Sequence, residues 1–243
     1  MKVIRKSGLL AVIFGLGLAA TAAQEKGKET PQAGPQHEMT TLYMVFLIRS
    51  PQATSQQFAA VRKAHIDYRF KLVTEDKDFA AGPFLDGGKI AGIAISRAAS
   101  AAEAKAWEEG DPAVEAGLLS VEIHPWYTAK GIFKKPSGPI DISKLKKYHI
   151  VFLSRGPSWT AEHTADGDRL QEAHMANIHK MAAAGKLITA GPFSDDGQLR
   201  GVFLFRTETV EETKALCDAD PAVQAGRLIA DIHPWLAPGD ALP

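Results

Sequence analysis

The 243-residue sequence contains a single cysteine, Cys217, and this scarcity sets the first limit on the fold. One cysteine cannot form a disulfide within the chain, so the hydrophobic core alone has to hold the fold together. Also missing are the HExxH and CxxC motifs of metal sites, the Walker phosphate loop and the glycine-rich dinucleotide fingerprint. We therefore expect neither a metal nor another cofactor in the functional site.

The sequence also lacks an excess of charge of either sign, with 28 basic and 28 acidic side chains. Three of the basic residues, Lys2, Arg5 and Lys6, lie within the first six positions, and without them 25 basic residues face 28 acidic ones, a net charge of −3. Because binding to phosphates needs a basic patch, this balance argues against nucleic acid as the main partner.

No apolar run is long enough to span a bilayer comfortably. Gly8 to Ala20 is an uncharged stretch of thirteen residues that follows the basic N-terminus and precedes the small residues Ala20-Thr21-Ala22-Ala23. This pattern predicts a secretory signal at residues 1–23, cleaved within Thr21 to Gln24, and a periplasmic or secreted protein without membrane contact after cleavage. An uncleaved membrane anchor is the alternative. Residues 24–40, rich in Gln, Lys, Glu, Gly and Pro, are predicted to form a disordered spacer.

What the sequence does contain is an internal repeat. Four blocks recur at an offset of 109 residues: Ala81-Gly82-Pro83-Phe84 with Ala190-Gly191-Pro192-Phe193, Asp111-Pro112-Ala113-Val114 with Asp220-Pro221-Ala222-Val223, His124-Pro125-Trp126 with His233-Pro234-Trp235, and His65 with His174. Arg49 matches Arg155 at an offset of 106, so the first loop is three residues longer in the second copy. We predict domains at 41–127 (copy one) and 147–237 (copy two), joined by a linker at 128–146.

Each copy has the same order of predicted elements. An apolar strand precedes a long helix, at 54–74 or roughly 160–184, and then come a short strand ending in Gly-Pro, a second strand, an Ala/Glu-rich helix and a last strand ending in His-Pro-Trp. This βαββαβ order is that of a ferredoxin-like unit, an α+β fold. Because a unit of about 90 residues is marginal for an independent core, we expect the two copies to pack sheet to sheet within the chain. A homodimer would be a further level of assembly.

A histidine in the middle of the first helix is the main candidate for chemistry. It lies on an apolar stripe in both copies, formed by Phe58, Val61, His65, Tyr68 and Leu72 and by Leu170, His174, Ile178 and Met181. Each histidine is therefore predicted to point at the sheet. The simpler interpretation is a core histidine that hydrogen-bonds to the backbone. A function is favoured because only Ala and His persist where their helix neighbours differ.

Asp111 and Asp220 each precede a proline in a pattern typical of a helix start, with Asp as the N-cap. The cap needs one carboxylate oxygen, so the other oxygen is available to hold a histidine. Each aspartate follows its histidine, His65 or His174, by 46 residues.

These residues resemble the YCII-related family of the dimeric α/β-barrel superfamily. Copy two, with Gly185-Lys186-Leu187-Ile188-Thr189-Ala190-Gly191-Pro192, is the closer match, whereas copy one departs at residues 75–80. The resemblance implies two ferredoxin-like units paired into a barrel, with a His–Asp dyad in a cleft. It maps these dyads, as catalytic residues, to His65 with Asp111 and to His174 with Asp220. Gly82, Pro83, Gly191 and Pro192 are expected at the pocket rim.

A second group of polar residues lies on the last strand of each copy. Glu122 shares a face with His124, and Asp231 with His233. We expect solvated charge on this face, and the alternative is that it lines the barrel interior.

The expected function is that of a small-molecule enzyme in which histidine acts as general acid and base beside its aspartate, in one or both copies. One branch of the family resembles a dechlorinating or isomerising enzyme, which suggests lyase-like or isomerase-like chemistry on a small polar molecule such as a carbonyl or enol acid. A non-catalytic periplasmic binding module is the first alternative. The second is a haem-binding barrel with His65 or His174 as axial ligand.

Overall fold

The computed structural model describes residues 38–136 and 140–243, so the predicted signal and residues 24–37 of the predicted spacer lie outside the described residues. Copy one consists of β1 (Met39–Arg49), α1 (Ser55–Thr74), β2 (Asp78–Pro83), β3 (Ile90–Ser96), α2 (Ala101–Glu108), α3 (Pro112–Glu115) and β4 (Leu119–Ala129). Copy two consists of β5 (Leu145–Arg155), α4 (Ala165–Ala183), β6 (Leu187–Pro192), β7 (Leu199–Phe205), α5 (Val210–Asp218), α6 (Pro221–Gln224) and β8 (Leu228–Pro238). The predicted βαββαβ order is confirmed, with one short additional helix before each last strand.

The predicted spacer and linker are too long at their ends. β1 begins at Met39 and β4 continues to Ala129, because the two strands pair over their full length of eleven residues. The linker therefore starts after Ala129 and contains a short 3-10 helix, η1 (Ile142–Lys144), before β5 starts at Leu145. Polar residues at these ends can belong to strands, because their backbone N–H and C=O groups hydrogen-bond to the neighbouring strand whatever their side chains are.

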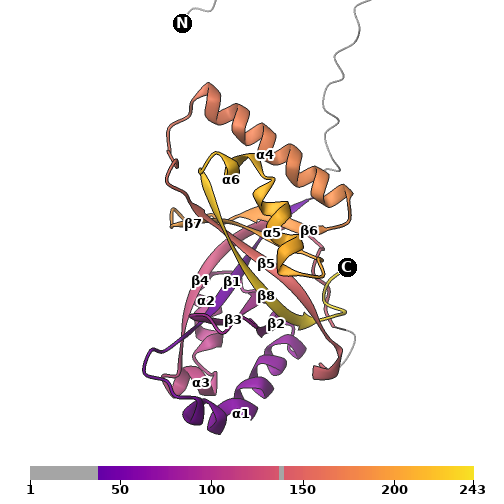
Figure 1. The fold of residues 1–243 in the computed structure, drawn as a ribbon. Coiled ribbons are helices and arrows are strands. Elements are labelled where there is room, and N and C mark those ends of the chain that lie inside the picture. Colours follow the sequence, from indigo (N-terminus) through magenta and orange to yellow (C-terminus); the bar gives the residue numbers. More distant parts are fainter. Residues whose placement is uncertain (1–37, 137–139) are drawn as a thin grey trace, which may run out of the picture. The chain divides into compact units, whose positions relative to one another are not determined.

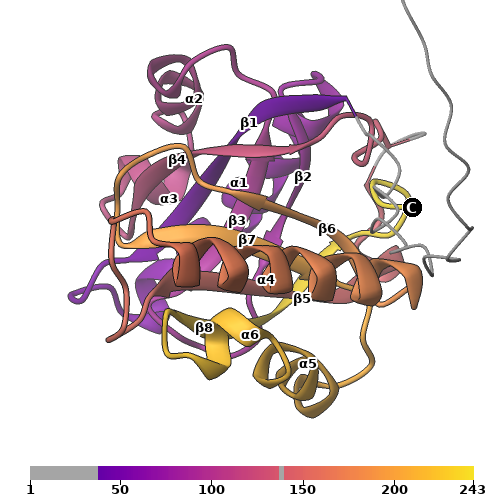
Figure 2. The same cartoon turned by 90° about the horizontal axis from the view of Figure 1, so that it is seen from above.

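Each copy forms one antiparallel sheet, with strand order β2-β3-β1-β4 in copy one and β6-β7-β5-β8 in copy two. The long helices α1 and α4 cover the outer faces of their own sheets (Figures 1 and 2). Alternate residues of the central strands supply the core beneath these helices, for example Val45 and Leu47 in β1 and Val151 and Leu153 in β5. None of the helices in the described part of the chain is both long and apolar enough to cross a membrane.

The inner faces of the two sheets pack against each other in one shared core, as predicted. This core contains apolar residues of both copies, and the rings of Phe46 and Phe152 meet at its centre with centroids 4.7 Å apart. The predicted pairing of the repeats within one chain is therefore confirmed.

The edges of the two sheets also meet, which closes the barrel. The indole of Trp235 in β8 donates to the carbonyl oxygen of Gly82 in β2 at 3.1 Å, and Trp126 in β4 donates to Gly191 in β6 at the same distance. A Cβ atom on Gly82 would lie 1.7 Å from the carbonyl oxygen of Leu236. Glycine is required there because the two backbones approach too closely for any side chain. Pro83 and Pro192 end their strands at this point, as the Gly-Pro pattern indicated.

The polar residues of the last strands link the two copies crosswise. His124 of copy one lies 2.7 Å from Asp195 of copy two, through Nδ1 and Oδ2, and His233 of copy two contacts Asp86 of copy one in the same way. The expectation of a solvated face is therefore wrong for the histidines, which are largely buried against phenylalanine rings of the barrel core. It is right for the exposed acids of the same strands, Glu122 and Asp231.

Candidate active site

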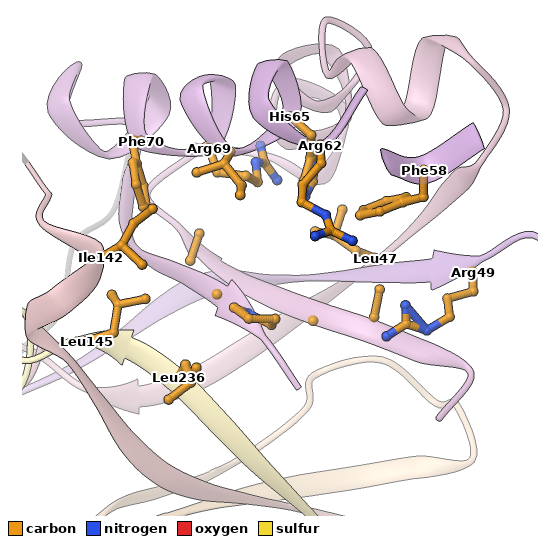
Figure 3. A pocket seen from close by; sticks show the side chains of 16 residues that line it. Leu47, Arg49, Phe58, Arg62, His65, Arg69, Phe70, Ile142, Leu145 and Leu236 are labelled. Carbon is orange, nitrogen blue, oxygen red and sulfur yellow. The ribbon is translucent and has the colours of Figure 1, made fainter. Parts of the chain in front are cut away.

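The candidate site lies between α1 and the outer face of its sheet. A capping box formed by Thr54 and Gln57 starts the helix, but only its C-terminal part, including Leu72 and Val73, is fully buried. Beneath the rest of the helix the sheet presents small residues such as Ala91 and Gly92. They leave a cavity of about 320 Å³, the copy-one cavity (Figure 3). Its walls include Leu47, Phe58, Ile66 and Phe70, together with Ile142, Leu145 and Leu236 of the linker and copy two.

The copy-one dyad borders this cavity. Nδ1 of His65 lies 2.8 Å from both carboxylate oxygens of Asp111. The same carboxylate caps α3, because its Oδ1 accepts the backbone N–H of Ala113 at 2.9 Å. The predicted pair is confirmed, and the aspartate fills both expected roles at once. With Nδ1 held by the carboxylate, Nε2 is the nitrogen of His65 that is left to meet a ligand in the cavity.

The copy-two dyad has the same geometry. Nδ1 of His174 lies 2.8 and 2.9 Å from the oxygens of Asp220, which caps α6 through Ala222. Asn177 adds a hydrogen bond to the second carboxylate oxygen at 3.0 Å. Burial raises the pKa of Asp220, but the hydrogen bonds from His174 and Asn177 outweigh this effect, so its pKa lies below the usual value. This carboxylate is therefore ionised at neutral pH.

A buried group of charges, absent from copy two, lies beside the copy-one dyad. We refer to Arg69, Glu108 and Asp78 as the charged cluster. The guanidinium of Arg69 binds both oxygens of Glu108, at 2.6 and 3.1 Å, and its Nε lies 3.5 Å from Asp111. Asp78 is 1% exposed, and burial raises its pKa to about 7 despite the opposing effect of Arg69.

Sequence reasoning missed the charged cluster, although the repeat contains the signal for it. At the 109-residue offset the three positions carry Ile178, Cys217 and Leu187 in copy two. Charged residues at positions that are apolar in the other copy indicate a buried ionic network, because these positions are buried in copy one and buried or half-buried in copy two.

The corresponding space in copy two is filled. Arg200 stands where copy one has Ala91, and Phe203 replaces Ala94 and stacks on His174 with centroids 5.8 Å apart. Trp159, in the longer loop, lies under the guanidinium groups of Arg155, Arg200 and Arg227. The open cavity beside a dyad therefore lies in copy one, although the sequence had suggested copy two as the closer match to the family pattern.

The residues predicted for the pocket rim line a cavity in copy one, whereas in copy two they lie at the barrel closure. Gly82 and Pro83 line the copy-one cavity. Gly191 lies against the carbonyl oxygen of Tyr127, at the barrel closure, and Pro192 follows it at the end of β6. Residues 38–136 and 140–243 contain no group of three or more His, Cys, Asp or Glu side chains placed to hold a metal ion.

Comparison with known proteins agrees with this architecture. A family model described as the YCII-related domain matches residues 41–127 and 158–236. Two variants of the chlorite dismutase from Candidatus Nitrospira defluvii align with TM-scores of 0.50 and 0.51 at 10% and 9% identity, each over 80% of this chain and 90% of the other. A haem-binding protein from Thermus thermophilus aligns with a TM-score of 0.49 at 13% identity, over 83% of this chain and 93% of the other. No curated protein matches the chain. At these identities, the two chlorite dismutase variants show a likeness of fold alone.

Proposed function

The chain belongs to the YCII-related family, and we propose that it is a small-molecule enzyme whose active site is the copy-one cavity, with His65 as general acid and base. The observation that carries this proposal is the position of the dyad. His65 borders a cavity of about 320 Å³, and Asp111 holds its Nδ1 at 2.8 Å. This volume falls at the lower end of the range of ligand pockets, which suits a small organic molecule.

The dyad supports proton transfer in a simple way. Nε2 of His65 takes a proton from a substrate carbon next to a carbonyl group, and the carboxylate of Asp111 stabilises the imidazolium that forms. The electron pair left on the carbon then either shifts, so that the proton returns at another atom, or expels a leaving group. The first course is an isomerisation and the second an elimination, so both agree with the lyase-like or isomerase-like expectation.

The residues of the cavity wall narrow the class of substrate in this proposal. The substrate was expected to be a small polar molecule, whereas aliphatic and aromatic side chains form most of the cavity wall, with three arginines and His65 among them. The proposed substrate is therefore a molecule with an apolar body and few polar groups.

Exchange of substrate hydrogen with solvent tests the proposal without knowledge of the product. A panel of small carbonyl acids is incubated with the protein in D2O, and loss of C–H signals is followed by NMR. We expect His65→Ala to slow the exchange by about 10²- to 10⁴-fold. His174→Ala serves as the matched control and should leave the rate nearly unchanged, because the space beside His174 is filled. Equal loss in both variants would contradict the choice of copy one.

The same samples distinguish the two alternatives. Binding of panel members without any exchange would indicate a non-catalytic binding module. Haem binding would appear as a Soret band on addition of haemin, and it should disappear in His65→Ala if Nε2 is the ligand, since Nδ1 is occupied by Asp111.

A further inference from the structure

Two arginines of the copy-one cavity have no acidic partner in the described part of the chain. Arg62 on α1 makes no hydrogen bond or ion pair there, and Arg49 at the end of β1 uses only its Nε, which donates to the carbonyl oxygen of Gly88 at 3.0 Å. The third arginine of the cavity, Arg69, is neutralised by Glu108. Free positive charge is therefore concentrated at Arg49 and Arg62.

These two arginines lie where two adjoining hollows meet. Arg49, Phe58 and Arg62 line the copy-one cavity and also a neighbouring hollow of about 400 Å³. Figure 3 shows both guanidinium groups turned into the space between α1 and the sheet. Arg62 precedes His65 by three residues on the helix, so its side chain lies on the same face as the imidazole.

A guanidinium group binds a carboxylate through parallel hydrogen bonds, and it does so more strongly where water is partly excluded. The apolar walls beyond the arginines suit a hydrocarbon or aromatic body. We propose that Arg49 and Arg62 bind the carboxylate of an apolar carbonyl acid, whose body fills the copy-one cavity and whose carbon next to the carbonyl group lies beside His65. This proposal rests on the proposed function and names the substrate class of that site.

Copy two provides the internal comparison. Arg155, the counterpart of Arg49, stacks over Trp159 and donates to the carbonyl oxygen of Asp196 at 3.0 Å. The position of Arg62 is occupied by Gln171. Copy two thus lacks the pair of free guanidinium groups, and the inference predicts one carboxylate site per chain.

Binding is tested by calorimetry and NMR on the full chain with 3-phenylpropionate, its neutral amide and 2-phenylethyl phosphate. The carboxylate should bind about tenfold or more tightly than the amide, the difference expected for one charge-assisted hydrogen-bonded pair. Arg49→Gln and Arg62→Gln should each weaken carboxylate binding about tenfold, and the double variant should bind carboxylate and amide equally. Arg155→Gln is the matched control and should bind as the wild type does.

Three results would overturn the inference: no measurable binding of the carboxylate, a preference that survives in the double variant, or tighter binding of the phosphate. His65→Ala separates this inference from the proposed function, because it should slow the exchange strongly and yet retain the preference for carboxylate over amide. Exchange that survives in His65→Ala would refute the role of histidine, and the binding preference would still decide the role of the arginines.

Discussion

At the scale of single residues, Asp111 combines two duties that one substitution can separate. Asn is as good an N-cap as Asp, so Asp111→Asn should preserve the start of α3 while removing the charge that holds His65. We expect exchange to fall about 10²-fold, whereas the free energy of unfolding should fall by about 1.5–3 kcal/mol, the cost of a hydrogen bond to a charged group. Thermal unfolding and the exchange assay measure the two effects. If neither the exchange rate nor the melting temperature changed, Asp111 would act as a helix cap alone.

Asp78 gives the protein a pH dependence of stability that can be predicted with its sign. Its pKa in the folded protein is about 7, above the value of 3.8 for a free side chain. Between these values the unfolded chain carries the negative charge and the folded chain carries the proton, so stability falls as pH rises from about 4 to about 7. The full difference amounts to at most about 4 kcal/mol.

Asp78→Asn should remove this slope and make the protein more stable than the wild type at pH 8, by about 1–3 kcal/mol. Urea unfolding at pH 5 and pH 8 is the measurement. Parallel pH profiles for both proteins would show that Asp78 is already ionised when folded.

The residues of the site were only partly predictable from sequence, and the reason is physical. His65 and Asp111 can be recognised from the sequence, because they lie on a helical stripe and in an Asp-Pro cap and have the same spacing in both copies. Arg69 sits just beside that stripe, and its contact partners are Glu108 in α2 and Asp111 just before α3, so nothing in the local pattern reveals these contacts. The space around each histidine depends on single differences between the copies, such as Ala91 in copy one and Arg200 in copy two. The effect of such a difference can be seen only in the three-dimensional packing.

At the scale of elements, the charged cluster joins α1, α2 and β2, where copy two uses apolar contacts. Removing one partner, as in Glu108→Ala, leaves Arg69 buried without its main counter-charge and should cost about 3–5 kcal/mol. The triple exchange Arg69→Ile, Glu108→Cys and Asp78→Leu reproduces the copy-two residues and should be neutral or stabilising by about 1–4 kcal/mol. Chemical denaturation of both variants tests this, and a triple variant less stable than Glu108→Ala would contradict it.

The order of elements was well predicted because each has a strong local signal: alternating apolar strands, capped helices and Gly-Pro strand ends. The cavity beneath α1 was not. The stripe from Phe58 to Leu72 predicted which face of the helix points at the sheet, but only the C-terminal part of the helix is fully buried. The small residues on β2 and β3 that open the cavity belong to other elements, so the helix sequence alone does not reveal the gap.

At the scale of the whole molecule, closure of the barrel depends on backbone contact at two glycines. Gly82→Ala would place a Cβ atom 1.7 Å from the oxygen of Leu236, so the edge strands β2 and β8 would have to separate. We expect a loss of about 1–3 kcal/mol, the usual cost of overpacking, or more if the indole bond of Trp235 is also lost. Gly88→Ala is the control, since its nearest contact would be a side-chain oxygen at 3.4 Å. Equal melting temperatures for the two variants would contradict this account.

The covalent link between the copies has a consequence for how the two halves can change over time. In a barrel built from two identical chains every substitution occurs twice, because the interface is isologous and each subunit carries the same residues. A tryptophan that filled one pocket would fill both. A gene that encodes both halves removes this constraint, so the half with Trp159 and Arg200 can become a rigid support while the other keeps an open, charged pocket. One half can specialise because mutations now change each half independently, and no new fold is needed.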